Sequence, residues 1–169
     1  METPLSLPEY AHLREVSDSC SDLNPLADGA RQLIQDMVDD VLNLMPDIKH
    51  FHLGGDESWG FATHTDTRNY AERYGKDRLY LQHVEPLLDN LTAKGIRPLL
   101  WHDMMIEWDD ATLKEIGAKA DIVVWGYEGH PDEADHHFNT RYIHRFHQLG
   151  MPLWAAGAFK GADTDRGMS

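Results

Sequence analysis

The order in which helical and apolar stretches alternate is the feature that most restricts the fold of this chain. An amphipathic helix is predicted over 27–45, where Ile34 and Val41 lie two turns apart on one face. Short apolar stretches without polar alternation are typical of strands buried in a parallel sheet. The sequence predicts strands over 50–55, 97–102, 121–127 and 151–159, further helices within 77–94, near 110–116 and over 135–149, and a polar loop over 58–70. This order predicts an α/β fold with parallel strands covered by helices.

The length and charge of the chain narrow the class of protein further. With 169 residues it is expected to form a single domain over 1–169, with 1–26 as an N-terminal lead-in segment. The net charge of -14 argues against nucleic-acid partners and against anionic membranes, although a solubilising surface explains it equally well. Cys20 has no second cysteine with which to form a disulfide, and the stretch METPLSLPEY lacks the features of a signal peptide. We therefore expect a cytoplasmic protein.

Acidic and aromatic residues recur where the predicted strands end. Such residues fit a sugar site, because flat apolar rings stack against sugars and carboxyl groups bind or activate them. Barrels and doubly wound sheets both place ligands at the carboxyl ends of parallel strands, so this recurrence does not choose between the two folds. The residues are Asp56 and Glu57 at the end of the first strand, Trp101, His102 and Asp103 at the end of the second, Trp125, Tyr127 and Glu128 at the end of the third, and Trp154 in the fourth.

The adjacent acids Asp56 and Glu57 suggest a particular kind of glycoside hydrolysis. Most glycosidases use two carboxylates that face each other across the scissile bond, whereas neighbouring side chains on a strand diverge. Adjacent acids suit a division of labour, in which Glu57 protonates the leaving group and Asp56 orients a nucleophile that the substrate supplies. Gly54 and Gly55 precede the pair and allow close approach of substrate or of a neighbouring strand.

The stretch FHLGGDESW resembles the H-x-G-G-D-E signature of family-20 glycoside hydrolases, the β-N-acetylhexosaminidases. Four further segments occur in the same order as in the hexosaminidase D branch of that family. EYAHLREV with DLNP precedes the signature, and PLLWHDMM, VVWGYE and LWAAGAFKGA come after it. The resemblance implies a (β/α)8 TIM barrel, which typically needs about 250 residues. We count about four β/α units, which correspond to family strands 4 to 7. The chain is therefore expected to be a partial catalytic barrel.

The resemblance also implies roles for individual residues. Glu57 would be the general acid/base, and Asp56 would bind the N–H of the substrate's 2-acetamido group, whose oxygen attacks the anomeric carbon to form an oxazolinium ion with retention of configuration. The implied substrate is an N-acetylglucosaminide or N-acetylgalactosaminide, and no cofactor or metal is implied. The other implied substrate-binding residues are His52, which supports the acid pair, Tyr127 at the acetamido oxygen, Trp101, Trp125 and Trp154 as pocket walls, and Asp103 at sugar hydroxyls.

Two other functions remain open from the sequence. A half-barrel that keeps only the pocket walls would bind sugars without hydrolysing them, and its exposed strand edges could pair two copies into a homodimer. A metal-dependent hydrolase is suggested by the run DEADHH at 132–137. His136 and His137 are adjacent in that run, so they point apart on a helix and lack the i, i+4 spacing of metal ligands.

Overall fold

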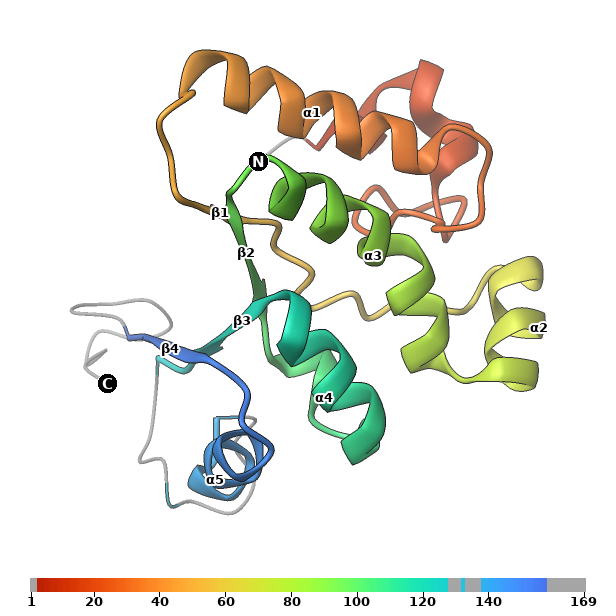
Figure 1. Cartoon of the computed structure of the whole chain (residues 1–169). Helices are drawn as coiled ribbons and strands as arrows, with labels where there is room; N and C mark the ends of the chain where they lie inside the picture. Colours follow the sequence, from red (N-terminus) through yellow and green to blue (C-terminus); the bar gives the residue numbers. More distant parts are fainter. Residues whose placement is uncertain (1–2, 128–131, 133–137, 158–169) are drawn as a thin grey trace. The chain divides into compact units, whose positions relative to one another are not determined.

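The computed structural model describes residues 3–127, 132 and 138–157 (Figure 1). The chain divides into two compact units. The first unit comprises Met1–Lys49 and Ser58–Ala93, and the second comprises His50–Glu57 and Lys94–Ser169. The chain crosses from one unit to the other after Lys49, after Glu57 and after Ala93. No helix in the described ranges is long and apolar enough to cross a lipid bilayer.

The second unit contains a parallel sheet, as the sequence predicts. Its strands lie in the order β1-β2-β3-β4, and each neighbouring pair is parallel (Figure 1). The strands are β1 His50–His52, β2 Arg97–Trp101, β3 Asp121–Trp125 and β4 Leu153–Ala156, and the helical segments are η3 Asp103–Met105, α4 Asp110–Lys119 and α5 Thr140–Gln148. The strands fall within the predicted ranges but are shorter. The helix predicted over 135–149 is described only as α5, because 133–137 lie outside the described residues.

Burial explains why these segments form a sheet and its covering helices. Leu100 of β2, Ile122 of β3 and Phe146 of α5 are fully buried, so the core of this unit lies between the strands and their helices. The helix α4 begins at Asp109, whose side chain accepts hydrogen bonds from the backbone N–H groups of the first turn. Because neighbouring strands are parallel, the carboxyl ends of all four strands point the same way. This geometry brings the residues at the strand ends together.

The first unit contains the remaining helices. These are the 3-10 helices η1 Pro4–Ser6 and η2 Pro8–Leu13, and the α-helices α1 Ala30–Leu44, α2 Thr65–Tyr74 and α3 Lys76–Ala93. The prediction of a polar loop over 58–70 was wrong, because α2 begins at Thr65. Thr67 is the one buried residue of this helix, which is described throughout, so it lacks the apolar stripe that marks a helix in a sequence.

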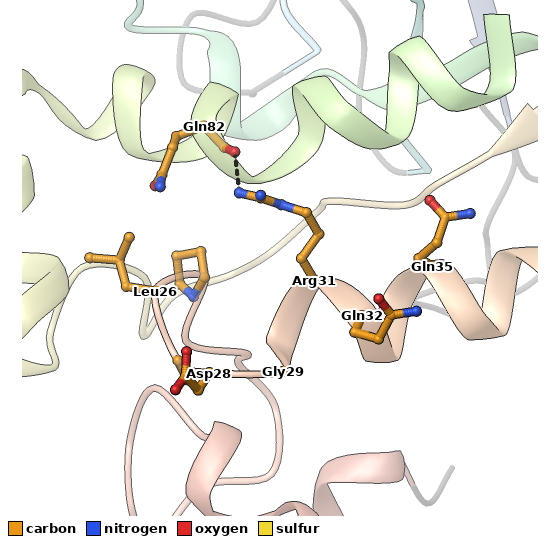
Figure 2. A pocket seen from close by; sticks show the side chains of 9 residues that line it. Leu26, Asp28, Gly29, Arg31, Gln32, Gln35 and Gln82 are labelled. Carbon is orange, nitrogen blue, oxygen red and sulfur yellow. Dashed lines mark hydrogen bonds between the residues drawn. The ribbon is translucent and has the colours of Figure 1, made fainter. Parts of the chain in front are cut away.

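A cavity of about 440 Å³ lies in the first unit beside the start of α1. Figure 2 shows Arg31 reaching from α1 to α3, where its guanidinium donates a hydrogen bond of 2.8 Å to the backbone oxygen of Gln82.

The imidazole of His83, also in α3, has an unusually low pKa. Burial, and secondarily the charge of Arg31, lower the pKa of His83 to about 4. The Nδ1 atom of His83 is buried without a hydrogen-bond partner in the described part of the chain.

The lowered pKa of His83 predicts how stability depends on pH. In the folded protein the imidazole stays neutral down to about pH 4, whereas in the unfolded chain it takes up a proton near pH 6.5. The free energy of unfolding should therefore fall by about 3 kcal/mol as the pH drops through this window. Urea denaturation at a series of pH values measures it. His83→Gln should flatten the fall and His12→Gln, an exposed control, should not; equal profiles for wild type and His83→Gln would contradict the assignment.

Candidate functional site

The chain turns sharply between β1 and the acid pair. Gly54 and Gly55 have φ angles of 77° and 83°, which cost glycine little. Glu57 has a φ of 46°, a left-handed conformation that a non-glycine residue adopts only at a cost of about 1–3 kcal/mol. The side chains of Asp56 and Glu57 are both exposed after this turn. Ala62 shares this left-handed conformation with a φ of 63°, and strain of this kind tends to occur at functional sites, so the geometry draws attention to the stretch that begins at Glu57.

A single carboxylate holds the backbone of Glu57. Asp103, the first residue of η3 after β2, accepts the N–H of Glu57 through Oδ2 at 2.8 Å. Its other oxygen, Oδ1, accepts the indole N–H of Trp125 at 2.9 Å. Asp103, which follows β2, thereby joins Glu57 after β1 to Trp125, the last residue of β3. Asp103 therefore holds the backbone of Glu57 and the indole of Trp125 in place, and its predicted contact with sugar hydroxyls stays a prediction.

Two pairs of rings lie at the same end of the sheet as the acids. The rings of Trp125 and Tyr127 are 5.2 Å apart and tilted by 38°. The rings of His52 and Trp101 are 4.2 Å apart and tilted by 48°. All four residues are half-buried. The structure therefore brings these four predicted residues to the strand ends that carry the acids.

His52 is held as a neutral imidazole. Its Nδ1 atom accepts the backbone N–H of Gly54 at 3.0 Å, which leaves the ring proton on Nε2. Burial lowers the pKa of His52, and the nearby charge of Asp56 partly opposes this. The Nε2 atom is buried and has no hydrogen-bond partner among the described residues. His52 thus buttresses the glycine turn through one nitrogen and retains an unused donor on the other.

Trp154 lies elsewhere, which corrects its predicted place as a pocket wall beside the acids. Its indole N–H donates to the Oδ2 atom of Asp121 at 2.8 Å, and its ring meets that of His50 edge-on at 5.3 Å. Asp121 and His50 are the first residues of β3 and β1, so the indole lies at the amino ends of the strands. The sequence placed Trp154 at a strand end, but it is the second residue of β4, which continues to Ala156.

His102 stands among the strand-end residues of the sequence, which gave it no specific role. It is fully buried behind Trp125, and its Nδ1 atom accepts the backbone N–H of Trp125 at 3.5 Å. Its ring also faces Phe146 of α5 edge-on at 6.4 Å. The signal in the sequence was its place between Trp101 and Asp103, which is where a strand gives way to the site. His102 supports the wall that Trp125 forms.

No group of three or more histidine, cysteine, aspartate or glutamate side chains placed to hold a metal ion occurs in residues 3–127, 132 and 138–157. The run 132–137, which suggested a metal-dependent hydrolase, lies outside the described residues except for Asp132.

Within the described residues, the carboxyl group of Glu57 makes no hydrogen bond or ion pair, and so it is available to a ligand.

Known proteins resemble the chain in sequence and in fold. The sequence profile described as glycosyl hydrolase family 20, catalytic domain, matches residues 6–142. Hexosaminidase D of Bos taurus is 31% identical over 96% of this chain and 48% of its own length. Hexosaminidase D of Homo sapiens is 31% identical over 96% of this chain and 34% of its own length. The chain thus spans about half or less of these relatives.

A solved structure shows the same architecture. The crystal structure of Dispersin B superposes with a TM-score of 0.61 at 17% identity, over 93% of this chain and 44% of that chain. At this identity the likeness concerns the fold. Together with the parallel sheet and its alternating helices, it identifies the chain as a partial (β/α) barrel.

The bridging role of Asp103 predicts the effect of Asp103→Asn. An amide nitrogen cannot accept, so either Glu57 or Trp125 loses its acceptor, and the free energy of unfolding should fall by about 1–3 kcal/mol. Urea denaturation measures the loss, and the indole N–H resonance of Trp125 shows whether its hydrogen bond has changed. Asp47→Asn, at an exposed aspartate, is the matched control. An unchanged denaturation midpoint together with an unchanged Trp125 resonance would rule out the bridge.

Proposed function

The chain belongs to glycosyl hydrolase family 20, and on that premise we propose that it carries the catalytic acids of a β-N-acetylhexosaminidase. The reaction is the hydrolysis of terminal, non-reducing N-acetyl-D-hexosamine residues from β-N-acetylhexosaminides. The observation that carries the proposal is the turn after β1, which exposes Asp56 and Glu57 beside His52 and fixes the Glu57 backbone on Asp103. The substrate class follows from the family and the reaction from the acid pair.

The proposed reaction proceeds in two steps with retention of configuration. In the first, Glu57 gives a proton to the glycosidic oxygen while the oxygen of the substrate's own 2-acetamido group attacks the anomeric carbon. The bond to the leaving group breaks, and an oxazolinium ion forms. Asp56 accepts a hydrogen bond from the acetamido N–H and stabilises the positive charge that develops there. In the second step, Glu57 takes a proton from a water molecule, and the water oxygen attacks the anomeric carbon. The bond from this carbon to the acetamido oxygen breaks, which opens the oxazolinium ring and restores the acetamido group.

The surroundings of the acids support this division of labour. The carboxyl group of Glu57 has no partner among the described residues, so a leaving-group oxygen can approach it. Trp101 and Trp125 supply flat apolar surfaces of the kind that stack against sugar rings. Tyr127 lies against Trp125, and its hydroxyl is the proposed partner of the acetamido oxygen.

A second function is favoured by the aromatic side chains at the strand ends, which suit sugar binding by themselves. The chain covers 48% and 34% of the two hexosaminidases. A partial barrel that retains the aromatic walls would bind N-acetylhexosamines without hydrolysing them. Catalysis by wild type, and its dependence on Glu57, separate this alternative from the proposed enzyme.

Replacing Glu57 by glutamine tests the proposed acid. Glutamine keeps the size of the side chain but has no acidic proton, so the turnover number for an aryl N-acetyl-β-glucosaminide should fall about 10²–10⁴-fold. Binding of N-acetylglucosamine, measured by calorimetry, should remain. Glu72→Gln, at an exposed glutamate of α2, should retain both. Wild type and Glu57→Gln that bind the sugar equally but are both inert would favour the sugar-binding alternative, and activity retained in Glu57→Gln would refute the assignment.

A further inference from the structure

Glu57 is followed directly by a loop, residues 58–64, that the first unit holds firmly. We call these residues the acid loop. They pack against residues 13–24, the anchoring hairpin, in which Arg14 and Leu23 form an antiparallel bridge. Two backbone hydrogen bonds close the hairpin: the N–H of Glu15 donates to the oxygen of Asp22 at 2.9 Å, and that of Asn24 donates to the oxygen of Leu13 at 2.8 Å. This pairing sets the side chains of Glu15 and Asp22 against the acid loop.

The Glu15 carboxylate accepts several donors from the end of the acid loop. Glu15 is only 2% exposed, and its Oε1 atom accepts the backbone N–H groups of Thr63 at 2.7 Å and His64 at 2.9 Å. The hydroxyl of Thr67 also donates to this oxygen. His64 is the N-cap of α2, so Glu15 supplies an acceptor to N–H groups that have no partner within the helix. The negative charge also lies where the helix dipole favours it.

Asp22 holds the beginning of the same loop. It is 7% exposed, and its Oδ2 atom accepts the N–H of Gly60 at 3.3 Å. A Cβ atom at residue 60 would lie 2.7 Å from this oxygen and 3.1 Å from Cγ2 of Val16. The loop therefore approaches the hairpin as closely as a glycine allows. Within the loop, the hydroxyl of Thr63 donates to the oxygen of Gly60 at 2.7 Å, which ties the two anchored ends together.

The two buried carboxyl groups are unusual because neither forms an ion pair with a cation in the part of the chain that the structure describes. The Oε2 atom of Glu15 and the Oδ1 atom of Asp22 are buried without a hydrogen-bond partner among the described residues. Burial raises the pKa of Asp22; the hydrogen bond from Gly60 opposes this and the Glu15 charge adds to it. Buried carboxylates cost several kcal/mol unless their hydrogen bonds compensate. Here the compensating donors belong almost entirely to the acid loop and the start of α2.

We infer that Glu15 and Asp22 are positioning residues for the catalytic acid. The left-handed backbone of Glu57, with its φ of 46°, persists only if the chain is constrained on both sides. The N–H of Glu57 donates to Asp103, and the chain that leaves Glu57 through Ser58 continues into the anchored loop. The inference rests on the proposed function, because it assigns the anchoring hairpin to the same acid.

The test compares Glu15→Ala, Glu15→Gln and the exposed control Glu72→Ala in the full chain. Hydrogen exchange at the amides of Thr63 and His64 should accelerate about tenfold or more in Glu15→Ala, because both amides lose a charged acceptor. The amide resonance of Glu57 should move as well. On an aryl N-acetyl-β-glucosaminide, kcat should fall up to about 10²-fold while KM changes little. Glu15→Gln keeps one acceptor oxygen and should recover part of each effect, and Glu72→Ala should match wild type.

Different outcomes separate this inference from the proposed function. If wild type does not hydrolyse the glucosaminide, the proposed function fails for this chain, and the exchange rates and the Glu57 resonance still decide the inference. Faster loop exchange with an unmoved Glu57 resonance and an unchanged kcat would overturn it, as would unchanged exchange. If Glu15→Ala does not fold, Thr67→Val replaces it, because it removes only a hydroxyl that donates to Glu15. The same shift of the Glu57 resonance is then required.

Discussion

The hydrogen bonds of the Asp103 carboxylate are the interaction on which the site depends. One oxygen fixes the backbone of Glu57 and the other fixes the indole of Trp125, so a residue after β2 sets the position of groups that follow β1 and end β3. In a parallel sheet the strand ends lie close together, but their side chains come from distant parts of the sequence and need a common reference. A short carboxylate with two accepting oxygens provides that reference.

The sequence predicts much of the sheet because its strands obey simple rules. The run DIVVW is β-branched and buried, and it forms β3 where expected. Helix α2 could not be predicted in the same way, because it is polar on nearly all sides and so lacks an apolar pattern. Its N-cap is His64, which is not one of the usual capping residues. The family resemblance is confirmed by the profile over 6–142 and by two hexosaminidases.

The site is less visible in the sequence than the fold. Residues that follow a strand can be found by position, which is how Asp56, Glu57, Trp101 and Trp125 were identified. Contacts between residues far apart in the sequence cannot be found by position. Asp103, for example, lies 46 positions from Glu57, whose backbone N–H it accepts. Trp154 shows the reverse case, because its place on a strand looked equivalent to the others, yet its indole is directed toward Asp121 at the amino end.

The left-handed backbone of Glu57 has an evolutionary consequence. Glycine or asparagine at residue 57 would adopt a φ of 46° at less cost, and selection for a more stable protein alone would favour either of them. A glutamate there gives up stability in exchange for an acidic side chain at a fixed point. Directed evolution for thermal tolerance without a screen for activity would therefore tend to lose the acid at this position first.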